Sequence, residues 1–183
     1  MKLGKFDRDR SITFIPPDGL FQLMSYRINE AINLPFKVMP VVQEIGSTKI
    51  EFSVKLKAIF DRNNFAQNVV VKIPVPAHTA QAKIFTTGAG RAKYEPDQQA
   101  VMWRIKKFQG EFEFVVSGEV LLSATKTQKT WNRPPISLEF SVPMFTSSGV
   151  RVRYLRVSEP KMDYKPTKWI RYMTKSGDYQ HRI

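Results

Sequence analysis

The chain of 183 residues carries 29 Lys and Arg residues against 16 acidic ones, and its formal net charge of +13 favours a polyanionic partner such as nucleic acid, anionic lipid or an acidic protein. It contains no Cys, which excludes disulfides, thiolate catalysis and Cys-ligated zinc. No apolar run is as long as a membrane span and the N-terminus does not resemble a signal peptide, so we expect neither secretion by this route nor a membrane-embedded chain.

Short extended segments separated by turn signals predict strands throughout the chain. The first predicted strands are residues 11–15 and 20–28, on either side of a Pro-Pro-Asp-Gly turn. Residues 35–45 are apolar and β-branched, and their two prolines suit an edge strand. Residues 49–59 give the clearest pattern, because apolar and polar side chains alternate strictly, as they do in antiparallel sheets with one wet face.

Further strands follow at similar spacing towards the C-terminus. They are predicted at residues 69–75, 82–87, 91–94, 101–105, 112–122, 136–142, 150–157 and 168–174. The Gly-Ala-Gly stretch at residues 88–90 predicts a hairpin turn between two of them. We find no helical pattern, and turn signals every 8–12 residues or so are typical of β-sandwiches. The sequence therefore predicts an all-β fold.

Residues that usually carry catalysis are sparse and badly spaced. His78 and His181 lie far apart and have no acidic residue at metal-ligand spacing. Residues 86–93 partly match a phosphate-binding loop, but they lack its full pattern and precede a strand. No nucleophile elbow occurs. We expect a binding protein without a metal ion or cofactor, and not an enzyme.

Basic side chains gather around the Gly-Ala-Gly stretch. In the predicted strand 101–105, Arg104 points away from the apolar side chains, and Lys106 follows on the same side. Arg91 and Lys93 alternate in the same way on a neighbouring strand. Lys83 and Lys107 also fall on these neighbouring strands. The six cations form either a binding face for an anion or part of a generally basic, solvated surface.

A second candidate site lies in the predicted strand 168–174. Because side chains alternate along a strand, Trp169 and Arg171 share one face, while Ile170 and Tyr172 share the other. An exposed indole beside a guanidinium makes a pocket wall for an aromatic or anionic group. The alternative is a core Trp whose neighbouring Arg extends to the edge of a sandwich.

Two kinds of binding protein fit these features. A nucleic-acid module would stack bases on aromatic side chains beside Lys and Arg. An adaptor would bind a peptide by strand addition while its basic face meets anionic lipid. The first kind predicts an RNP-like motif, and the sequence contains none.

Several runs of sequence resemble the C-terminal (mu homology) domain of the medium subunits of clathrin adaptor complexes, and they extend over essentially the whole chain. They are FIPPDG at 14–19, LMSYR at 23–27, NLPFKV at 33–38, GRAKY at 90–94, WRIK at 103–106, RPPI at 133–136, VRYL at 152–155 and KWIRY at 168–172. The run NLPFKV is most similar to the plasma-membrane (endocytic) type, whereas residues 86–87 and 172–178 also suit the trans-Golgi and endosomal type.

The resemblance implies an elongated pair of β-sandwich subdomains, the second inserted into the first. Residues 1–31 and 145–183 would form the cargo-binding subdomain, and residues 32–144 the inserted one. The family domain starts upstream of Phe6, so the resemblance also implies an N-terminally truncated form in which the first subdomain is incomplete.

The resemblance further implies a function in clathrin-mediated endocytosis and vesicle transport. The expected partners are the other subunits of a heterotetrameric adaptor complex, Tyr-x-x-hydrophobic sorting signals of transmembrane cargo, and membranes that contain phosphatidylinositol 4,5-bisphosphate; nucleic acid is not expected. The implied location is the cytoplasmic face of the plasma membrane in clathrin-coated pits, with the trans-Golgi network or endosomes as the alternative.

The resemblance also assigns roles to the two candidate sites. The residues that it implies for cargo binding are Trp169, Arg171, Ile170, Lys168, Val152 and Leu155. The residues that it implies for phosphoinositide binding are Arg91, Lys93, Arg104 and Lys106.

Overall fold

The structure, a computed structural model, describes residue 6 and residues 8–123, 131–159 and 165–183. The chain divides into two compact units, residues 1–31 and 32–183. In the first unit the Arg10 amide donates a hydrogen bond to the Phe6 carbonyl, and the Phe14 and Phe21 rings pack 5.6 Å apart. The described part of this unit contains no strand.

Ten strands are described in the second unit, and all of them pair in the antiparallel sense. They are β1 (Phe36–Ile45), β2 (Lys49–Ala58), β3 (Phe65–Pro74), β4 (Thr79–Thr87), β5 (Arg91–Glu95), β6 (Ala100–Gln109), β7 (Glu113–Leu122), β8 (Ile136–Pro143), β9 (Met173–Lys175) and β10 (Tyr179–His181). A short 3-10 helix, η1 (Pro96–Gln98), connects β5 to β6.

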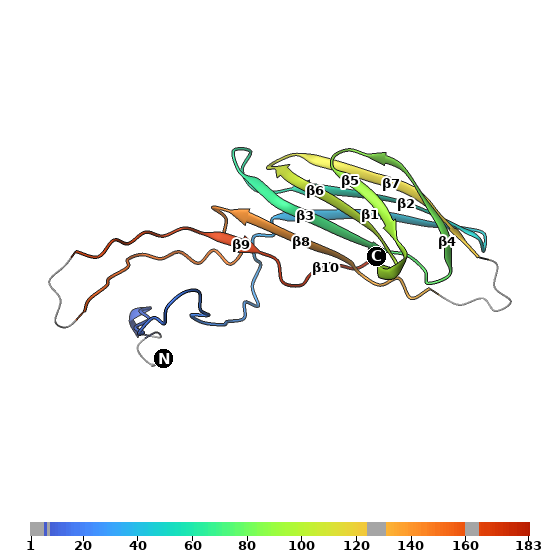
Figure 1. The fold of residues 1–183 in the computed structure, drawn as a ribbon. Helices are drawn as coiled ribbons and strands as arrows, with labels where there is room; N and C mark the ends of the chain where they lie inside the picture. Colours follow the sequence, from blue (N-terminus) through green and yellow to red (C-terminus); the bar gives the residue numbers. More distant parts are fainter. Residues whose placement is uncertain (1–5, 7, 124–130, 160–164) are drawn as a thin grey trace. The chain divides into compact units, whose positions relative to one another are not determined.

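These strands form two sheets that pack into a sandwich (Figure 1). The four-stranded sheet has the order β1-β2-β7-β4. The six-stranded sheet has the order β10-β8-β3-β6-β5, and β9 also pairs with β8. Strict alternation explains the arrangement, because each sheet turns its apolar side chains inward and its charged side chains outward.

One apolar core joins the two sheets. Phe36 of β1 and Trp103 of β6 are fully buried, and they come from different sheets. The Phe36 ring makes edge contacts with the rings of Phe108 and Phe140, each at 5.2 Å between centroids. Burial of each large side chain contributes about 1.5–3 kcal/mol, so this core fixes the positions of the outward-facing side chains.

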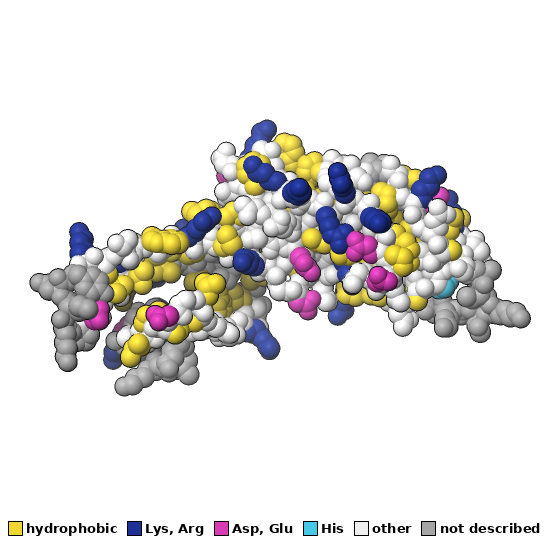
Figure 2. Space-filling model, viewed as in Figure 1, with side chains coloured by type: hydrophobic (Ala, Val, Ile, Leu, Met, Phe, Trp, Pro, Cys, Tyr) yellow, Lys and Arg dark blue, Asp and Glu magenta, His cyan; other side chains and the backbone are white. Residues whose placement is uncertain are grey.

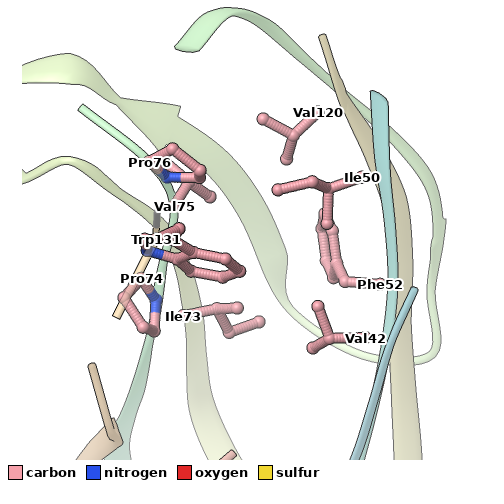
Figure 3. Close-up of a pocket in the computed structure, with 9 residues that line it drawn as sticks. All are labelled: Val42, Ile50, Phe52, Ile73, Pro74, Val75, Pro76, Val120 and Trp131. Atoms are coloured by element: carbon pink, nitrogen blue, oxygen red, sulfur yellow. The ribbon is translucent and has the colours of Figure 1, made fainter. Parts of the chain in front are cut away.

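A small apolar pocket remains between the sheets near one end of the sandwich (Figure 3). Its lining consists of Val42, Ile50, Phe52, Ile73, Pro74, Val75, Pro76, Val120 and Trp131. The Trp131 ring lies beside the Pro74–Pro76 segment and faces Ile50 and Phe52 across the gap. Since every lining residue is apolar, the pocket provides no group for acid–base catalysis or for metal binding.

The predicted all-β class is confirmed, and most predicted strands of the sandwich lie within a few residues of observed ones. Residues 49–59 are predicted and β2 covers Lys49–Ala58; residues 136–142 are predicted and β8 covers Ile136–Pro143. The signal is reliable here because each strand has a dry face and a wet face.

Several predictions of local structure are wrong. Residues 11–15, 20–28 and 150–157 form no strand, and only the last part of 168–174 does so, as β9. A strand requires a hydrogen-bonded neighbour, and none of the described segments pairs with these residues. The Gly-Ala-Gly stretch is not a hairpin turn, because β4 pairs with β7 and β5 pairs with β6, in the other sheet.

Candidate functional site

The four predicted phosphoinositide-binding residues lie on the outer face of the six-stranded sheet. Arg91 of β5 stands directly opposite Arg104 of β6, and Lys93 stands opposite Met102. Lys106 lies two residues beyond Arg104, on the same side, while Trp103 and Ile105 point into the core. All four cationic side chains are exposed. Figure 2 shows Lys and Arg side chains on this face of the sandwich, with acidic side chains among them.

One acidic residue on this face is paired with a candidate cation. The Arg104 guanidinium donates two hydrogen bonds to the Glu95 carboxylate, Nη1 to Oε1 at 2.6 Å and Nη2 to Oε2 at 3.1 Å. The hydrogen bond to Arg104 lowers the pKa of Glu95, and the same bond raises the pKa of Arg104. Glu95 therefore stays charged at neutral pH and occupies the fork that would otherwise face a phosphate.

The connection between β4 and β5 packs closely against β6. The buried Trp103 indole donates a hydrogen bond to the Ala89 carbonyl at 2.6 Å. Gly90 has φ of +72°, and a Cβ at this position would lie 2.2 Å from the Arg104 carbonyl oxygen. Only glycine fits this close approach, which places Arg91 beside Arg104 at the start of β5.

Sequence reasoning missed one cation of this face. Lys72 of β3 stands opposite Met102, and Met102 stands opposite Lys93, so the two lysines share one row across three strands. The Lys72 ammonium donates a hydrogen bond to the Gln98 side chain at 3.0 Å. The outward phase of Lys72 follows from the buried Val71 and Ile73 on either side. Lys72 and Lys93 lie far apart in the sequence. Their proximity depends on the pairing of β3 with β6, which no local sequence pattern predicts.

The predicted cargo-binding residues lie in two extended segments that run side by side. The Lys168 ammonium donates a hydrogen bond to the Leu155 carbonyl at 2.7 Å. The Val152 amide donates to the Tyr172 hydroxyl at 2.9 Å, and the Met144 amide donates to the Tyr172 carbonyl. These contacts bring Lys168, Val152 and Leu155 into one group, although no regular ladder forms there.

The remaining cargo candidates, Trp169, Ile170 and Arg171, are exposed. The Trp169 side chain is 75% accessible and is not a core residue, which contradicts the interpretation of a core Trp with an Arg at the sheet edge. The prediction that residues 168–172 form a strand is wrong as well. Their side chains therefore cannot be assigned to two alternating faces of a strand. What the described chain does present is a solvent-facing indole close in sequence to a guanidinium.

The described residues contain no group of three or more acidic or His side chains that could hold a metal ion. They also include no helix with the length and apolar character of a membrane span. The candidate site therefore consists of an exposed cationic sheet face and an exposed, aromatic-bearing extended segment.

Comparison with known proteins places the whole chain in one family. The model of the adaptor complexes medium subunit family matches residues 1–183. The AP-2 complex subunit mu of Dictyostelium discoideum is 54% identical over 185 residues, and the proteins of the same name from Schizosaccharomyces pombe and Caenorhabditis elegans are each 42% identical. Each match covers all of this chain and 41–42% of the relative.

A known adaptor-complex structure has a similar fold. It is described as a homology model of the full-length AP-3 complex in an intermediate open conformation, and it matches with a TM-score of 0.62 at 22% identity. The match covers 93% of this chain and 49% of that chain, and at this identity it concerns the fold alone. With a family model that spans every residue, and relatives more than 40% identical along the whole chain, the resemblance in the sequence is confirmed: the chain belongs to the adaptor complexes medium subunit family.

Proposed function

We propose that this chain acts as the membrane- and cargo-binding part of a clathrin adaptor medium subunit, in a heterotetrameric complex at clathrin-coated pits of the plasma membrane. The observation that carries the proposal is the exposed cluster of cations on the outer face of the six-stranded sheet. Medium subunits are coat components and not enzymes, in agreement with the sparse catalytic residues. The three relatives bear the name AP-2 complex subunit mu, which supports the endocytic class over the trans-Golgi and endosomal class.

We also propose the domain division that the family resemblance implies. Residues 32–144 would form the inserted sandwich, and residues 1–31 and 145–183 would belong to the cargo-binding subdomain, giving an elongated pair. The exposed apolar side chains of 150–157 and 168–172 support this division, because extended apolar segments of this kind pair with further strands in complete sandwiches. The matched relatives are more than twice as long as this chain.

The ligand of the cationic face is phosphatidylinositol 4,5-bisphosphate in a bilayer. Each basic side chain near an anionic membrane surface contributes about 1 kcal/mol. The Arg91/Lys93/Arg104/Lys106→Glu variant should therefore lose nearly all binding to vesicles that contain this lipid. The measurement is cosedimentation with vesicles of phosphatidylcholine with and without the phosphoinositide, at fixed salt.

A charge-matched control separates a site from general basicity. Lys37, Lys55, Lys57 and Lys83 project from the other sheet, and their replacement by Glu changes the net charge by the same amount. Equal losses in the two variants would refute a localised site. Tighter binding of the wild type to single-stranded nucleic acid than to the vesicles would favour a nucleic-acid module instead.

The second ligand is a Tyr-x-x-hydrophobic sorting signal, bound as an extended peptide beside residues 168–172. The Trp169 indole would pack on the peptide tyrosine and the Arg171 guanidinium would lie beside the same ring. Ile170 and Lys168 would flank the peptide, and Val152 and Leu155 would line the pocket for its hydrophobic side chain. A phosphate on the tyrosine would not fit, so phosphorylation should prevent binding.

Calorimetry with three peptides tests this site: the signal, its Tyr→Ala form and its phosphorylated form. Residues 1–183 alone should bind weakly, because the Trp169 side chain is 75% open to solvent and would hold the peptide tyrosine from one side. A chain extended upstream to the length of the family domain should bind the signal with micromolar affinity, about −8 kcal/mol. In that longer chain Trp169→Ala should cost about 2 kcal/mol. Equal binding of the three peptides would exclude Trp169 and Arg171 from recognition.

A further inference from the structure

Two connections meet at one end of the sandwich and expose apolar side chains there. The loop of residues 59–64 joins β2 to β3, and the turn of residues 110–112 joins β6 to β7 (Figure 1). The Ile59 side chain is 56% exposed and the Phe112 side chain 38% exposed. Figure 2 shows hydrophobic surface interspersed with Lys and Arg side chains at this end. We name Ile59, Arg62, Phe65, Lys107 and Phe112 the aromatic tip.

Backbone contacts hold the two connections in a fixed arrangement. The Ala58 amide donates a hydrogen bond to the Phe112 carbonyl at 2.9 Å, and the Gly110 amide donates to the Asn64 carbonyl at 3.0 Å. A Cβ on Gly110 would lie only 2.0 Å from the Asp61 carbonyl oxygen, so the two chains touch without an intervening side chain. The tip is thus preformed, and a partner would not have to order it.

The two cations of the tip rest on aromatic rings and not on carboxylates. The Lys107 ammonium lies 3.7 Å from the centre of the Phe65 ring, and the Arg62 guanidinium carbon lies 5.8 Å from the centre of the Phe112 ring. Neither cation takes part in an ion pair within the described residues. A ring face orients a cation without neutralising its charge, so both charges remain available to an anionic partner.

The charged residues next to the aromatic tip leave its net charge positive. Lys106 adjoins Lys107 and links the tip to the cationic sheet face. Two acids belong to the same connections: Asp61, whose carboxylate accepts a hydrogen bond from the Asn63 amide, and the exposed Glu111. Glu113, which follows Phe112 in the chain, is paired with Lys55 of β2 at 3.2 Å. With this pair included, four cations stand against three carboxylates, which leaves an excess of positive charge beside the exposed apolar side chains.

The opposite end of the sandwich provides an internal comparison. Ile45 is 45% exposed and Leu121 is 38% exposed, so apolar exposure there matches that of the tip. Among the described residues at that end, two cations are paired with carboxylates: Lys49 with Glu51 at 2.8 Å and with Glu119 at 2.9 Å, and Arg133 with Glu44 at 2.7 Å. Within the described residues, both ends expose apolar side chains, and they differ in whether the neighbouring cations are paired with carboxylates.

We propose that the aromatic tip inserts into the headgroup region of an anionic bilayer, with Ile59 and Phe112 at the boundary of the acyl chains and with Arg62 and Lys107 at the level of the lipid phosphates. Aliphatic and aromatic side chains next to Lys and Arg are the combination that binds at this boundary. The proposal shares with the proposed function only the membrane as a partner, because insertion requires no phosphoinositide headgroup.

The absence of Cys from the chain allows each position to be labelled singly. Ile59→Cys, Phe112→Cys, Ile45→Cys and Leu121→Cys variants would each carry an environment-sensitive fluorophore. With vesicles of phosphatidylcholine and phosphatidylserine, labels at 59 and 112 should shift to the blue and brighten, and labels at 45 and 121 should not. Neutral phosphatidylcholine vesicles should produce no shift. Equal shifts at both ends, or none at 59 and 112, would overturn the proposal.

Binding measurements separate insertion from headgroup recognition. The Ile59→Asp/Phe112→Asp variant should bind phosphatidylserine vesicles about tenfold more weakly than the wild type, and the Ile45→Asp/Leu121→Asp variant should bind like the wild type. The tip variant should still prefer vesicles with phosphatidylinositol 4,5-bisphosphate, whereas the Arg91/Lys93/Arg104/Lys106→Glu variant should lose that preference. Loss of the preference in the tip variant alone would contradict both assignments.

The alternative to membrane insertion is that the aromatic tip binds another protein. If sedimentation shows that the tip substitutions dissociate a dimer while vesicle binding stays unchanged, then the tip is a contact between copies of the chain and the lipid proposal fails. Should the double Asp variant unfold, as judged by circular dichroism, the four single labels still decide the question, because each replaces an exposed side chain.

Discussion

Glu95 acts on the cationic face as an internal competitor. Its carboxylate holds the Arg104 guanidinium with two hydrogen bonds, so a lipid phosphate must displace it. We expect Glu95→Gln to bind phosphoinositide vesicles about fivefold more tightly, since one negative charge near the anionic surface is removed. Cosedimentation at fixed salt measures the change.

The matched control is Glu139→Gln, which removes an exposed carboxylate from β8 in the same sheet. An equal gain in this variant would show that net charge, and not the release of Arg104, determines affinity.

The effect of pH on vesicle binding follows from the direction in which the pKa of Glu95 is shifted. Because the pKa of Glu95 is lowered, its pair with Arg104 persists above the ordinary glutamate value and is lost only as pH falls through the lowered one. The ratio between wild type and variant should therefore be the same at pH 5 and pH 7.

At the scale of elements, the pairing of β5 with β6 depends on Gly90. A side chain at this position would collide with the Arg104 carbonyl and the Ile105 side chain, and φ of +72° is unfavourable for other residues. Gly90→Ala should lower the free energy of unfolding by about 2 kcal/mol. It should also weaken vesicle binding, because Arg91 would shift relative to Arg104.

Urea unfolding compares Gly90→Ala with Gly177→Ala. A Cβ on Gly177 meets no atom within 4 Å, so that variant should unfold like the wild type. If Gly90→Ala were equally stable, the close approach of the β4–β5 connection to β6 would not exist in solution.

The strands that the sequence predicted correctly are those whose alternation faces a core. In β2 and β6, apolar side chains at every second position point to the opposite sheet, and local sequence suffices to find them. The same alternation in residues 150–157 faces no core, and its contacts with residues 168 and 172 involve side chains and form no backbone ladder, so no strand forms. The three-residue β10 escaped prediction because its pairing with β8 depends on tertiary contacts and not on its own pattern.

For the candidate site, too, local alternation was predictable from the sequence and strand pairing was not. Alternation correctly separated Arg104 and Lys106 from the buried Trp103. The row of Lys93, Met102 and Lys72 was not predictable, because it requires the register of β5, β6 and β3. The assignment of the Gly-Ala-Gly stretch to a hairpin failed for the same reason: partner choice is a property of the whole sandwich.

At the scale of the molecule, Tyr179 ties the two sheets together. Its hydroxyl donates a hydrogen bond to the Phe36 carbonyl of β1, and its ring makes an edge contact with Phe140 at 5.5 Å. Ala58 of β2 stands opposite Phe36, but its amide donates a hydrogen bond to the Phe112 carbonyl and not to Phe36. The Phe36 carbonyl therefore relies on the Tyr179 hydroxyl as its hydrogen-bond donor. Tyr179→Phe should cost about 1–2 kcal/mol in stability.

Burial raises the pKa of Tyr179, which predicts how stability changes at high pH. Both folded and unfolded forms carry a neutral phenol below the ordinary value, so the contribution is fully present there and is lost as pH rises through the raised value. The measurement is chemical unfolding from pH 8 to pH 11 in wild type and Tyr179→Phe. Their difference should shrink as pH rises, and a difference that stays constant would show that Tyr179 ionises freely in the folded chain.

The tie between Tyr179 and Phe36 joins residues that are 143 positions apart. During synthesis at about 5–20 residues per second, roughly 7 to 29 seconds pass between the appearance of the two residues. During that time β1 can pair with β2, but the Tyr179 hydroxyl that donates to the Phe36 carbonyl from the other sheet has not yet been made. A ribosome can therefore begin the sandwich early, but the contact between the two sheets that Tyr179 makes with Phe36 can form only after the intervening residues have been synthesised.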